Sequence, residues 1–237
     1  MLTAYDYPTA KIVDEVGVDY ILVGDSLGMV VLGHPDTKSV TMVDMVHHLR
    51  AVVRGAKKSH IVGDLPVDSY NNVKDAVKNA RLLKNAGAHS VKLEGAKPEI
   101  ISAIIREGIP VMGHLGLLPQ TAEKYKVQGK DQEEAEQIYQ DAKLLDSLGV
   151  FALVLECVPS ELARRITENI KTPTIGIGAG VYCSGQVLVI HDALGLSDFK
   201  GRMAKQYINS KEIMKKALAE FKDEVKTEKF PTEKNSF

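Results

Sequence analysis

Five short apolar runs in the chain each end on an acidic residue or a histidine, and a glycine, a proline or a loop signal follows. The terminal residues are Asp25, Asp64, Glu94, His114 and Glu156. Apolar runs of this length are typical of buried strands. In a parallel barrel the C-terminal strand ends meet at one rim, and such barrels carry their chemistry there. The pattern predicts a barrel with a polar site at that rim.

A second pattern, an amphipathic helix followed by a glycine and then a strand, recurs along the chain. The glycines are Gly17, Gly87 and Gly149, with Gly108 as a variant. Glycine suits the left-handed residue that ends a helix and turns the chain into the next strand. Strands that alternate with helices in this way imply right-handed βαβ units and a parallel sheet.

The fold class predicted from these patterns is α/β, a (βα)8 TIM barrel. At 237 residues the chain fits one such barrel, so we assign residues 1–237 to a single domain. We expect one further helix at about 210–222, with Ser210 as its N-cap, and a polar tail at about 223–237. The eight strands are expected near residues 1–4, 20–24, 60–64, 90–94, 110–114, 151–156, 174–178 and 186–190.

The bulk properties exclude several kinds of partner. A net charge of -1 gives no electrostatic case for nucleic acid or an anionic membrane. No apolar stretch approaches the roughly 20 residues that span a bilayer, and Met1 is followed by no signal-like core. The two cysteines, Cys157 and Cys183, suit a reducing compartment. We therefore expect a cytoplasmic protein that binds neither nucleic acid nor membrane.

Three of the strand-end residues are carboxylates that suggest a metal site. Asp25, Asp64 and Glu94 end consecutive strands, and neighbouring strands lie about 4.8 Å apart. Three carboxylates at that spacing repel one another unless a cation neutralises them. Oxygen ligands favour Mg²⁺ over zinc. The alternative is that each acid caps a helix or bonds loop amides.

Lys92 is two residues before Glu94, so both side chains face the same side of their strand. A lysine that points into the barrel must be paired, and it would neutralise the acids or bind an anionic substrate. The alternative places Lys92 between the barrel and the outer helices, with its stem buried.

Glu156 and His114 are candidates for proton transfer and for binding a substrate oxygen. Glu156 ends a strongly apolar run, where a carboxylate is suited to act as a base. Its alternative is to cap the helix that begins near Pro159. His114 lies in a crowded turn where its imidazole can bond a substrate oxyanion, but a lone histidine is more often structural.

Seven motifs, in order along the chain, resemble those of the ketopantoate hydroxymethyltransferase (3-methyl-2-oxobutanoate hydroxymethyltransferase) family. The resemblance runs from Thr3 to about Tyr207. The motifs occupy residues 23–28, 63–66, 91–95, 113–116, 125–129, 155–159 and 176–180.

The resemblance implies a barrel of the phosphoenolpyruvate/pyruvate superfamily, assembled as a homo-oligomer that is usually a decamer. It implies transfer of a one-carbon unit from 5,10-methylenetetrahydrofolate to 2-oxoisovalerate, which makes ketopantoate for pantothenate and coenzyme A synthesis. Mg²⁺ would be the only true cofactor and would stabilise an enolate of the substrate. The folate would be a consumed cosubstrate.

The resemblance also assigns roles to the strand-end residues. Asp25 and Asp64 match the metal-holding aspartates, and Glu94 matches the third acid of that site. Glu156 matches the proposed catalytic base. Ser26 and Lys92 match contacts to the 2-oxo acid, so the expected substrate-binding residues are Asp25, Ser26, Asp64, Lys92 and His114.

The chain departs from the family pattern at three places. Met1 practically begins the first strand, where members carry a helical segment. The loop over residues 120–125 is shorter than usual, and Ser184 replaces an aspartate. From the residues alone, two other functions stay open. One is another Mg²⁺-dependent aldolase or lyase of 2-oxo or 2-hydroxy acids, and the other is a non-catalytic barrel, against which the retained buried charges argue.

Overall fold

A ring of eight parallel strands forms the centre of the part spanning Met1–Val189, in a computed structural model that describes residues 1–237. Each strand is hydrogen-bonded to the next in chain order. A parallel bridge between Leu2 and Leu188 joins the first strand to the segment after the eighth. The predicted (βα)8 fold is therefore confirmed. The strands are β1 (Leu2–Thr3), β2 (Tyr20–Val23), β3 (His60–Asp64), β4 (Ser90–Lys92), β5 (Val111–Gly116), β6 (Ala152–Glu156), β7 (Thr174–Ile177) and β8 (Gly185–Gln186).

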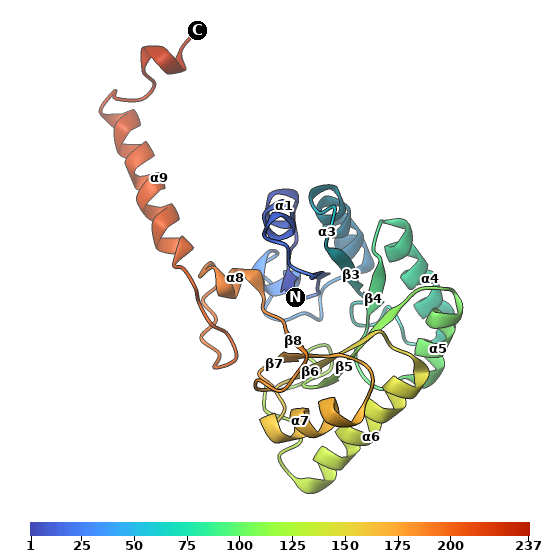
Figure 1. Cartoon of the computed structure of the whole chain (residues 1–237). Coiled ribbons are helices and arrows are strands. Elements are labelled where there is room, and N and C mark those ends of the chain that lie inside the picture. Colours follow the sequence, from blue (N-terminus) through green and yellow to red (C-terminus); the bar gives the residue numbers. More distant parts are fainter. The chain divides into compact units, whose positions relative to one another are not determined.

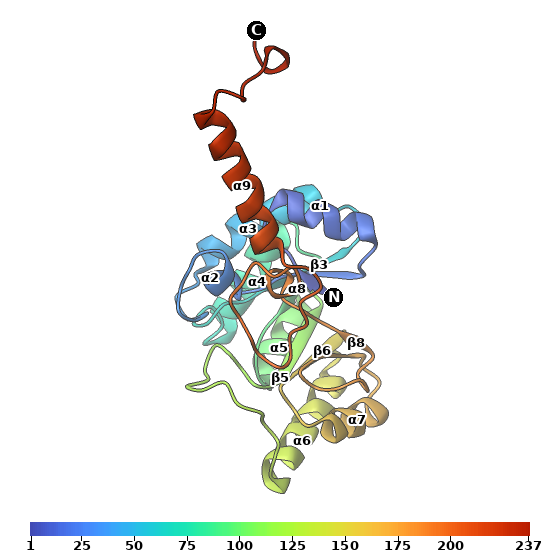
Figure 2. The same ribbon diagram turned by 90° about the vertical axis from the view of Figure 1, so that its left-hand side faces the viewer.

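Helices cover the outside of the strands (Figure 1). Because α2 is only a single turn, α1 packs directly beside α3. On another flank, α4 packs beside α5 (Figure 2). The helices of the barrel are α1 (Tyr7–Val16), α2 (Leu27–Val30), α3 (Met42–Gly55), α4 (Val73–Asn85), α5 (Pro98–Arg106), α6 (Gln132–Leu148) and α7 (Ser160–Asn169).

Glycines with positive φ end several of the helices. Gly17 and Gly149 both have a φ of 82°, and their amides close the last turns of α1 and α6. A left-handed residue of this kind costs little only when it is glycine. Gly87 and Gly108 also have positive φ, and each lies two residues beyond the end of its helix, α4 or α5. The predicted left-handed glycines are confirmed.

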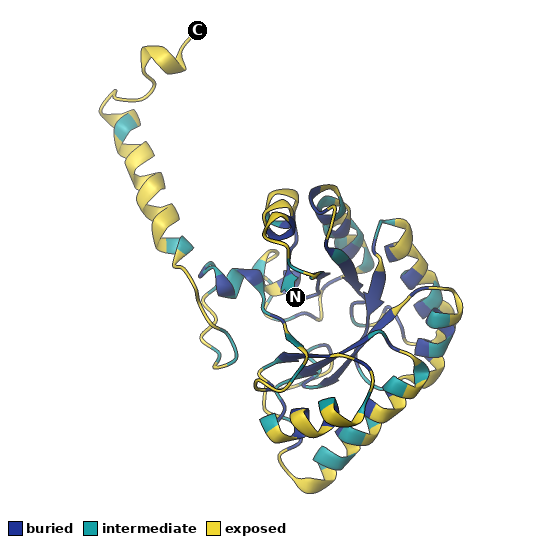
Figure 3. Cartoon of the chain, in the orientation of Figure 1, coloured by how far each residue is buried: buried dark blue, intermediate teal, exposed yellow.

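The barrel interior is apolar along most of its depth. Most strand residues are buried, while the helices are exposed on their outer faces (Figure 3). This apolar filling leaves the polar residues of the strand ends as a separate layer at one rim. The interior cluster consists of Leu22, Val62, Met112, Ala152, Val154, Ile175 and Val187.

The chain separates into two compact units, Met1–Val189 and Ile190–Phe237. The barrel strands lie within the first unit, so the assignment of residues 1–237 to one domain stays a prediction. The second unit contains α8 (Ile190–Ala193), α9 (Ser210–Lys226) and a 3-10 turn (Glu233–Asn235). No helix of the protein combines the length and the apolar character that a bilayer crossing requires.

The predicted C-terminal helix is present as α9, but two of its details were wrong. Asn209, and not Ser210, is the N-cap, because its side chain accepts a hydrogen bond from the Glu212 amide at 3.4 Å. The helix continues to Lys226 instead of ending near Lys222. None of its residues is buried.

Candidate active site

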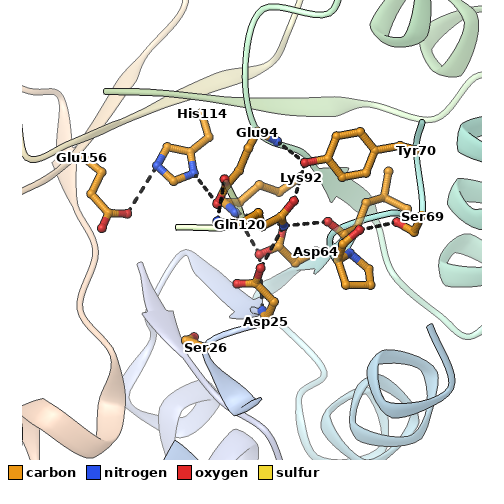
Figure 4. Close-up of polar contacts among 12 residues, drawn as sticks. Asp25, Ser26, Asp64, Ser69, Tyr70, Lys92, Glu94, His114, Gln120 and Glu156 are labelled. Atoms are coloured by element: carbon orange, nitrogen blue, oxygen red, sulfur yellow. Dashed lines mark hydrogen bonds and ion pairs between the residues drawn. The ribbon is translucent and has the colours of Figure 1, made fainter. Parts of the chain in front are cut away.

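The strand-end residues singled out by the sequence lie together at the C-terminal rim of the barrel (Figure 4). Asp25 follows β2, and Asp64 and Glu156 are the last residues of β3 and β6. Glu94 lies two residues beyond β4, whereas His114 lies within β5. Glu156 is partly exposed, and the other four are buried. The structure therefore brings all five predicted residues into one site.

Lys92 and Asp64 form the strongest ion pair of this site. The Lys92 Nζ donates to both carboxylate oxygens of Asp64, at 2.9 and 2.8 Å. The two residues are direct partners in the β3–β4 register, which sets the geometry. Burial opposes the charge of Lys92, but Asp64, Asp25 and Glu94 overcome that effect and raise the lysine pKa. Lys92 therefore stays cationic inside the barrel, and the alternative position outside it is wrong.

Asp25 is held by the side chain of Gln120, from the loop after β5. The Gln120 Nε2 donates to Asp25 Oδ2 at 2.8 Å and to the Leu65 carbonyl at 2.9 Å. The Asp25 amide donates to Asp64 Oδ2 at 3.4 Å. One carboxylate oxygen of Asp25 is thus fixed from the protein side.

The Glu94 side chain is almost completely buried. The Gln120 amide donates to Glu94 Oε2 at 3.1 Å, and the Glu94 amide donates to the Tyr70 hydroxyl at 3.4 Å. Burial raises the pKa of Glu94 to about 9, with Lys92 opposing and Asp25 and Asp64 adding to the shift. Without a further cation the Glu94 carboxyl is protonated at neutral pH.

His114 lies between Glu94 and Glu156. Its Nδ1 is 3.6 Å from Glu94 Oε1, and its Nε2 is 3.3 Å from Glu156 Oε2. Neither ring nitrogen has a well-aligned hydrogen bond. Burial, followed by the nearby charge of Lys92, lowers the His114 pKa. The ring is therefore neutral and can direct one N–H and one lone pair at its neighbours or at a substrate.

Glu156 is the most accessible of the acids, with 12% of its side chain exposed. The alternative role of a helix cap is not observed. Pro159 is the N-cap residue of α7, and no side chain caps that helix end. Glu156 is thus left to face the open end of the site.

Ser26 directly follows Asp25 and begins the short helix α2. Its Oγ lies 2.8 Å from the Tyr5 hydroxyl. In Figure 4 it lies below Asp25, on the far side from the Glu94–His114 row. Its hydroxyl is therefore positioned next to the carboxylates without bridging them.

The three predicted metal ligands are close together but do not form a ready-made ligand set. No group of three His, Cys, Asp or Glu residues has the arrangement of a metal site. The reason is that Lys92 takes both oxygens of Asp64, and Gln120 lies between Asp25 and Glu94.

The donor chemistry of the site nevertheless fits a hard divalent cation. Three carboxylates face one lysine, so acidic groups outnumber basic ones, and burial is the main cause of the raised pKa of Glu94. Oxygen donors of this kind are the usual ligands of Mg²⁺. Binding the ion would require Asp64 to share its oxygens between Lys92 and the metal.

Two other segments noted in the sequence have structural roles. Ser184, where the family pattern has aspartate, exchanges hydrogen bonds with Thr174 at 3.3 and 3.2 Å. In the glycine-rich motif at residues 176–180, a Cβ added to Gly180 would lie 2.2 Å from the Ser160 Oγ. Both segments are explained by local packing next to β7.

Sequence reasoning missed two loop residues, Gln120, which contacts the carboxylates, and Tyr70, which contacts Gln120 and the Glu94 amide. The Tyr70 hydroxyl donates a short hydrogen bond to Gln120 Oε1. Neither residue ends an apolar run, so the pattern that revealed the acids does not include them. The only signal is that Gln120 follows β5 within four residues.

Solved structures with a similar fold define the class of the protein. One is 2,3-dimethylmalate lyase, described as a PEP mutase/isocitrate lyase superfamily member. It is 16% identical with a TM-score of 0.63, covering 94% of this chain and 82% of that chain. Phosphonopyruvate hydrolase is 12% identical with a TM-score of 0.65, covering 82% and 77%. The protein is therefore an α/β barrel of the type found in this superfamily.

Sequence comparisons define the family within that class. The model described as ketopantoate hydroxymethyltransferase matches residues 1–233. Two relatives are named 3-methyl-2-oxobutanoate hydroxymethyltransferase. The protein of Acetivibrio thermocellus is 56% identical over 100% of this chain and 87% of its own length. That of Ignicoccus hospitalis is 54% identical over 98% and 91%.

The chain belongs to the ketopantoate hydroxymethyltransferase family and is an enzyme. The resemblance stated from the seven motifs is confirmed. The alternative of a non-catalytic barrel is accordingly set aside.

Proposed function

We propose that the enzyme transfers a hydroxymethyl group from 5,10-methylenetetrahydrofolate to 2-oxoisovalerate, which yields ketopantoate for pantothenate and coenzyme A biosynthesis. The relatives are named for this group and for this acceptor, since 3-methyl-2-oxobutanoate is 2-oxoisovalerate. The observation that carries the proposal is a row of contacts that starts at the Asp64–Lys92 pair and ends at Glu156. It runs through Asp25, Gln120, Glu94 and His114. It places cation-binding acids at one end and an accessible carboxylate at the other.

Asp25, Asp64 and Glu94 are the residues that would hold Mg²⁺. When bound, the ion supplies a Lewis acid that polarises the carboxylate and the 2-oxo group of the substrate. A phosphonopyruvate hydrolase structure of similar fold is described as a complex with oxalate and Mg++, which supports the same ion here.

The residues of the chain bind and orient the 2-oxo acid. Lys92, which Asp64 keeps charged and in place, attracts the anionic substrate and stabilises negative charge that develops on its 2-oxo oxygen. Ser26 and the neutral ring of His114 offer further hydrogen bonds to substrate oxygens.

Glu156 is the base. It takes the proton from C3 of 2-oxoisovalerate, and the electrons of that C–H bond delocalise toward the 2-oxo group. C3 then forms a carbon–carbon bond to the one-carbon unit of the cosubstrate. The two C–N bonds that hold this carbon to the folate are replaced by the new C–C bond and by a C–O bond to the oxygen of water. The C3 proton taken by Glu156 and the second proton of water pass to the two folate nitrogens, and tetrahydrofolate is released.

We also infer that the enzyme works as a homo-oligomer, with the decamer that the family resemblance implies. The exposed apolar stripe of α9 supports an association of this kind, because such surfaces are usually covered. The stripe consists of Met214, Leu218, Phe221 and Val225. A cytoplasmic location stays a prediction from the sequence.

The reaction is tested by incubating the enzyme with 2-oxoisovalerate and omitting one component at a time. Ketopantoate, followed by NMR or mass spectrometry, is expected only when Mg²⁺ and methylenetetrahydrofolate are both present. Turnover of 2-oxoisovalerate without the folate would instead favour the remaining alternative, an aldolase or lyase on the same barrel.

A further inference from the structure

Gln120 is the one side chain of the site that bonds three different segments of the barrel rim. Its Nε2 reaches Asp25 and the Leu65 carbonyl, its Oε1 accepts from Tyr70, and its own amide reaches Glu94. The residue is buried. Gln120 therefore contacts two of the three proposed metal-holding acids directly.

The orientation of the Gln120 carboxamide is fixed by chemistry. The Tyr70 hydroxyl oxygen accepts from the Glu94 amide, so the hydroxyl hydrogen points elsewhere and donates to Gln120 Oε1. Nε2 must then face Asp25 and Leu65, where both partners are acceptors. A flipped amide would place an oxygen against a carboxylate and a carbonyl.

Gln120 also stands at the start of an exposed loop, residues 121–128. The Thr121 and Ala122 amides donate to the Leu118 carbonyl at 3.1 and 2.9 Å, and the residues that follow are largely exposed. The loop borders a hollow of about 400 Å³ whose lining includes Gly116. Gly116 is paired with Glu156 in the β5–β6 register. The loop thus joins the carboxylates at one end and lies beside the proposed base at the other.

We propose that Gln120 is a positioning residue that couples the metal-holding carboxylates to the loop over residues 121–128. Its side chain fixes one oxygen of Asp25 and its backbone amide fixes one oxygen of Glu94, so both carboxylates that would hold the ion are kept in place. Binding of the ion then stabilises the Gln120 contacts and, through them, the start of the loop. By linkage, a loop that is held in place favours the ion to the same extent. This inference rests on the proposed Mg²⁺ site.

The test uses Gln120→Met, which keeps the volume of the side chain and removes its side-chain hydrogen bonds to Tyr70, Asp25 and Leu65. The backbone bond from residue 120 to Glu94 stays. Tyr70→Phe removes only the hydroxyl that orients the amide and serves if Gln120→Met does not fold. Gln137→Met, on the exposed face of α6, is the matched control. Two readouts are Mg²⁺ affinity by calorimetry and the rate of tryptic cleavage after Lys124 and Lys126, with and without Mg²⁺.

We expect Mg²⁺ to slow cleavage of the loop in the wild type and in Gln137→Met. In Gln120→Met the affinity should fall roughly 10- to 100-fold, as for other residues that orient metal ligands. The protection by saturating Mg²⁺ should also be lost, and Tyr70→Phe should show both effects to a smaller degree. Unchanged affinity and unchanged protection in Gln120→Met, with Mg²⁺ still bound by the wild type, would overturn the inference alone. A wild type that does not bind Mg²⁺ would overturn the metal site as well.

Discussion

Lys92 and Asp64 face each other across β3 and β4, and each is almost completely buried, with 6% and 1% of the side chain exposed. Both oxygens of the carboxylate accept from the same ammonium group. A buried pair of this kind is costly to break, because the remaining charge has neither water nor a partner. The pair is therefore a structural element as well as part of the site.

Replacing Lys92 with methionine should lower the free energy of unfolding by about 3–5 kcal/mol, because Asp64 would be left unpaired. The quantity is measured by urea unfolding at neutral pH. The double variant Asp64→Asn/Lys92→Met should recover part of the loss. Lys74→Met, on the exposed face of α4, is the control. A change below about 1 kcal/mol in Lys92→Met would show that the pair contributes little.

Position 116 requires glycine for two reasons, its positive φ and the closeness of neighbouring atoms. Its φ is 92°, and a Cβ there would lie 2.2 Å from the Glu156 carbonyl oxygen. Gly149 has a φ of 82° with open space around it. Gly149→Ala should therefore cost only the left-handed strain, about 1–2 kcal/mol, whereas Gly116→Ala should cost more and reduce activity. Equal losses in urea unfolding would contradict the close contact with Glu156.

The stability of the cation-free protein should depend on pH through Glu94. Its pKa rises from 4.5 to about 9 on folding, mainly through burial. Between these values the unfolded chain releases the proton and the folded chain keeps it, so stability falls as pH rises from about 5 to about 9. Urea unfolding with EDTA at pH 5, 7 and 9 measures this slope. Glu94→Gln should flatten it, and an unchanged slope would remove Glu94 as its source.

The dependence of activity on Mg²⁺ should require the Asp25 carboxylate. With Asp25→Ala, one of the proposed ligands is absent, so kcat/KM should fall to the level of the wild type treated with EDTA, and excess Mg²⁺ should not restore it. Glu133→Ala, on exposed α6, removes an acid far from the site and should behave as wild type. Activity in Asp25→Ala that Mg²⁺ still stimulates normally would sink the assignment of Asp25.

The strands and the acids at their ends were predictable because burial on both faces leaves a continuous apolar run with a polar residue at its end. The side of the strand on which the Lys92 side chain lies was also predictable, because Lys92 is two residues from Glu94. Its partner was not, because pairing with Asp64 depends on the register between β3 and β4.

Loop residues were harder to predict. Gln120 and Tyr70 are separated by 50 positions and meet only because two loops fold over the same rim. The start of α9 was misassigned for a similar reason, since Asn209 and Ser210 are both good caps and local geometry selects between them. The resulting arrangement of Gln120 between Asp25 and Glu94 also explains why the predicted ligands do not form a ready-made metal site.

The central claim, that Glu156 removes the C3 proton in a metal-dependent step, is tested most directly by proton–deuterium exchange at C3 of 2-oxoisovalerate. NMR in D₂O would follow the wild type, Glu156→Gln and the exposed control Glu161→Gln, each with Mg²⁺ and with chelator. The account predicts exchange in the wild type and the control only with Mg²⁺, and a rate lower by roughly 10²–10⁴-fold in Glu156→Gln. Exchange in Glu156→Gln at the wild-type rate would contradict it.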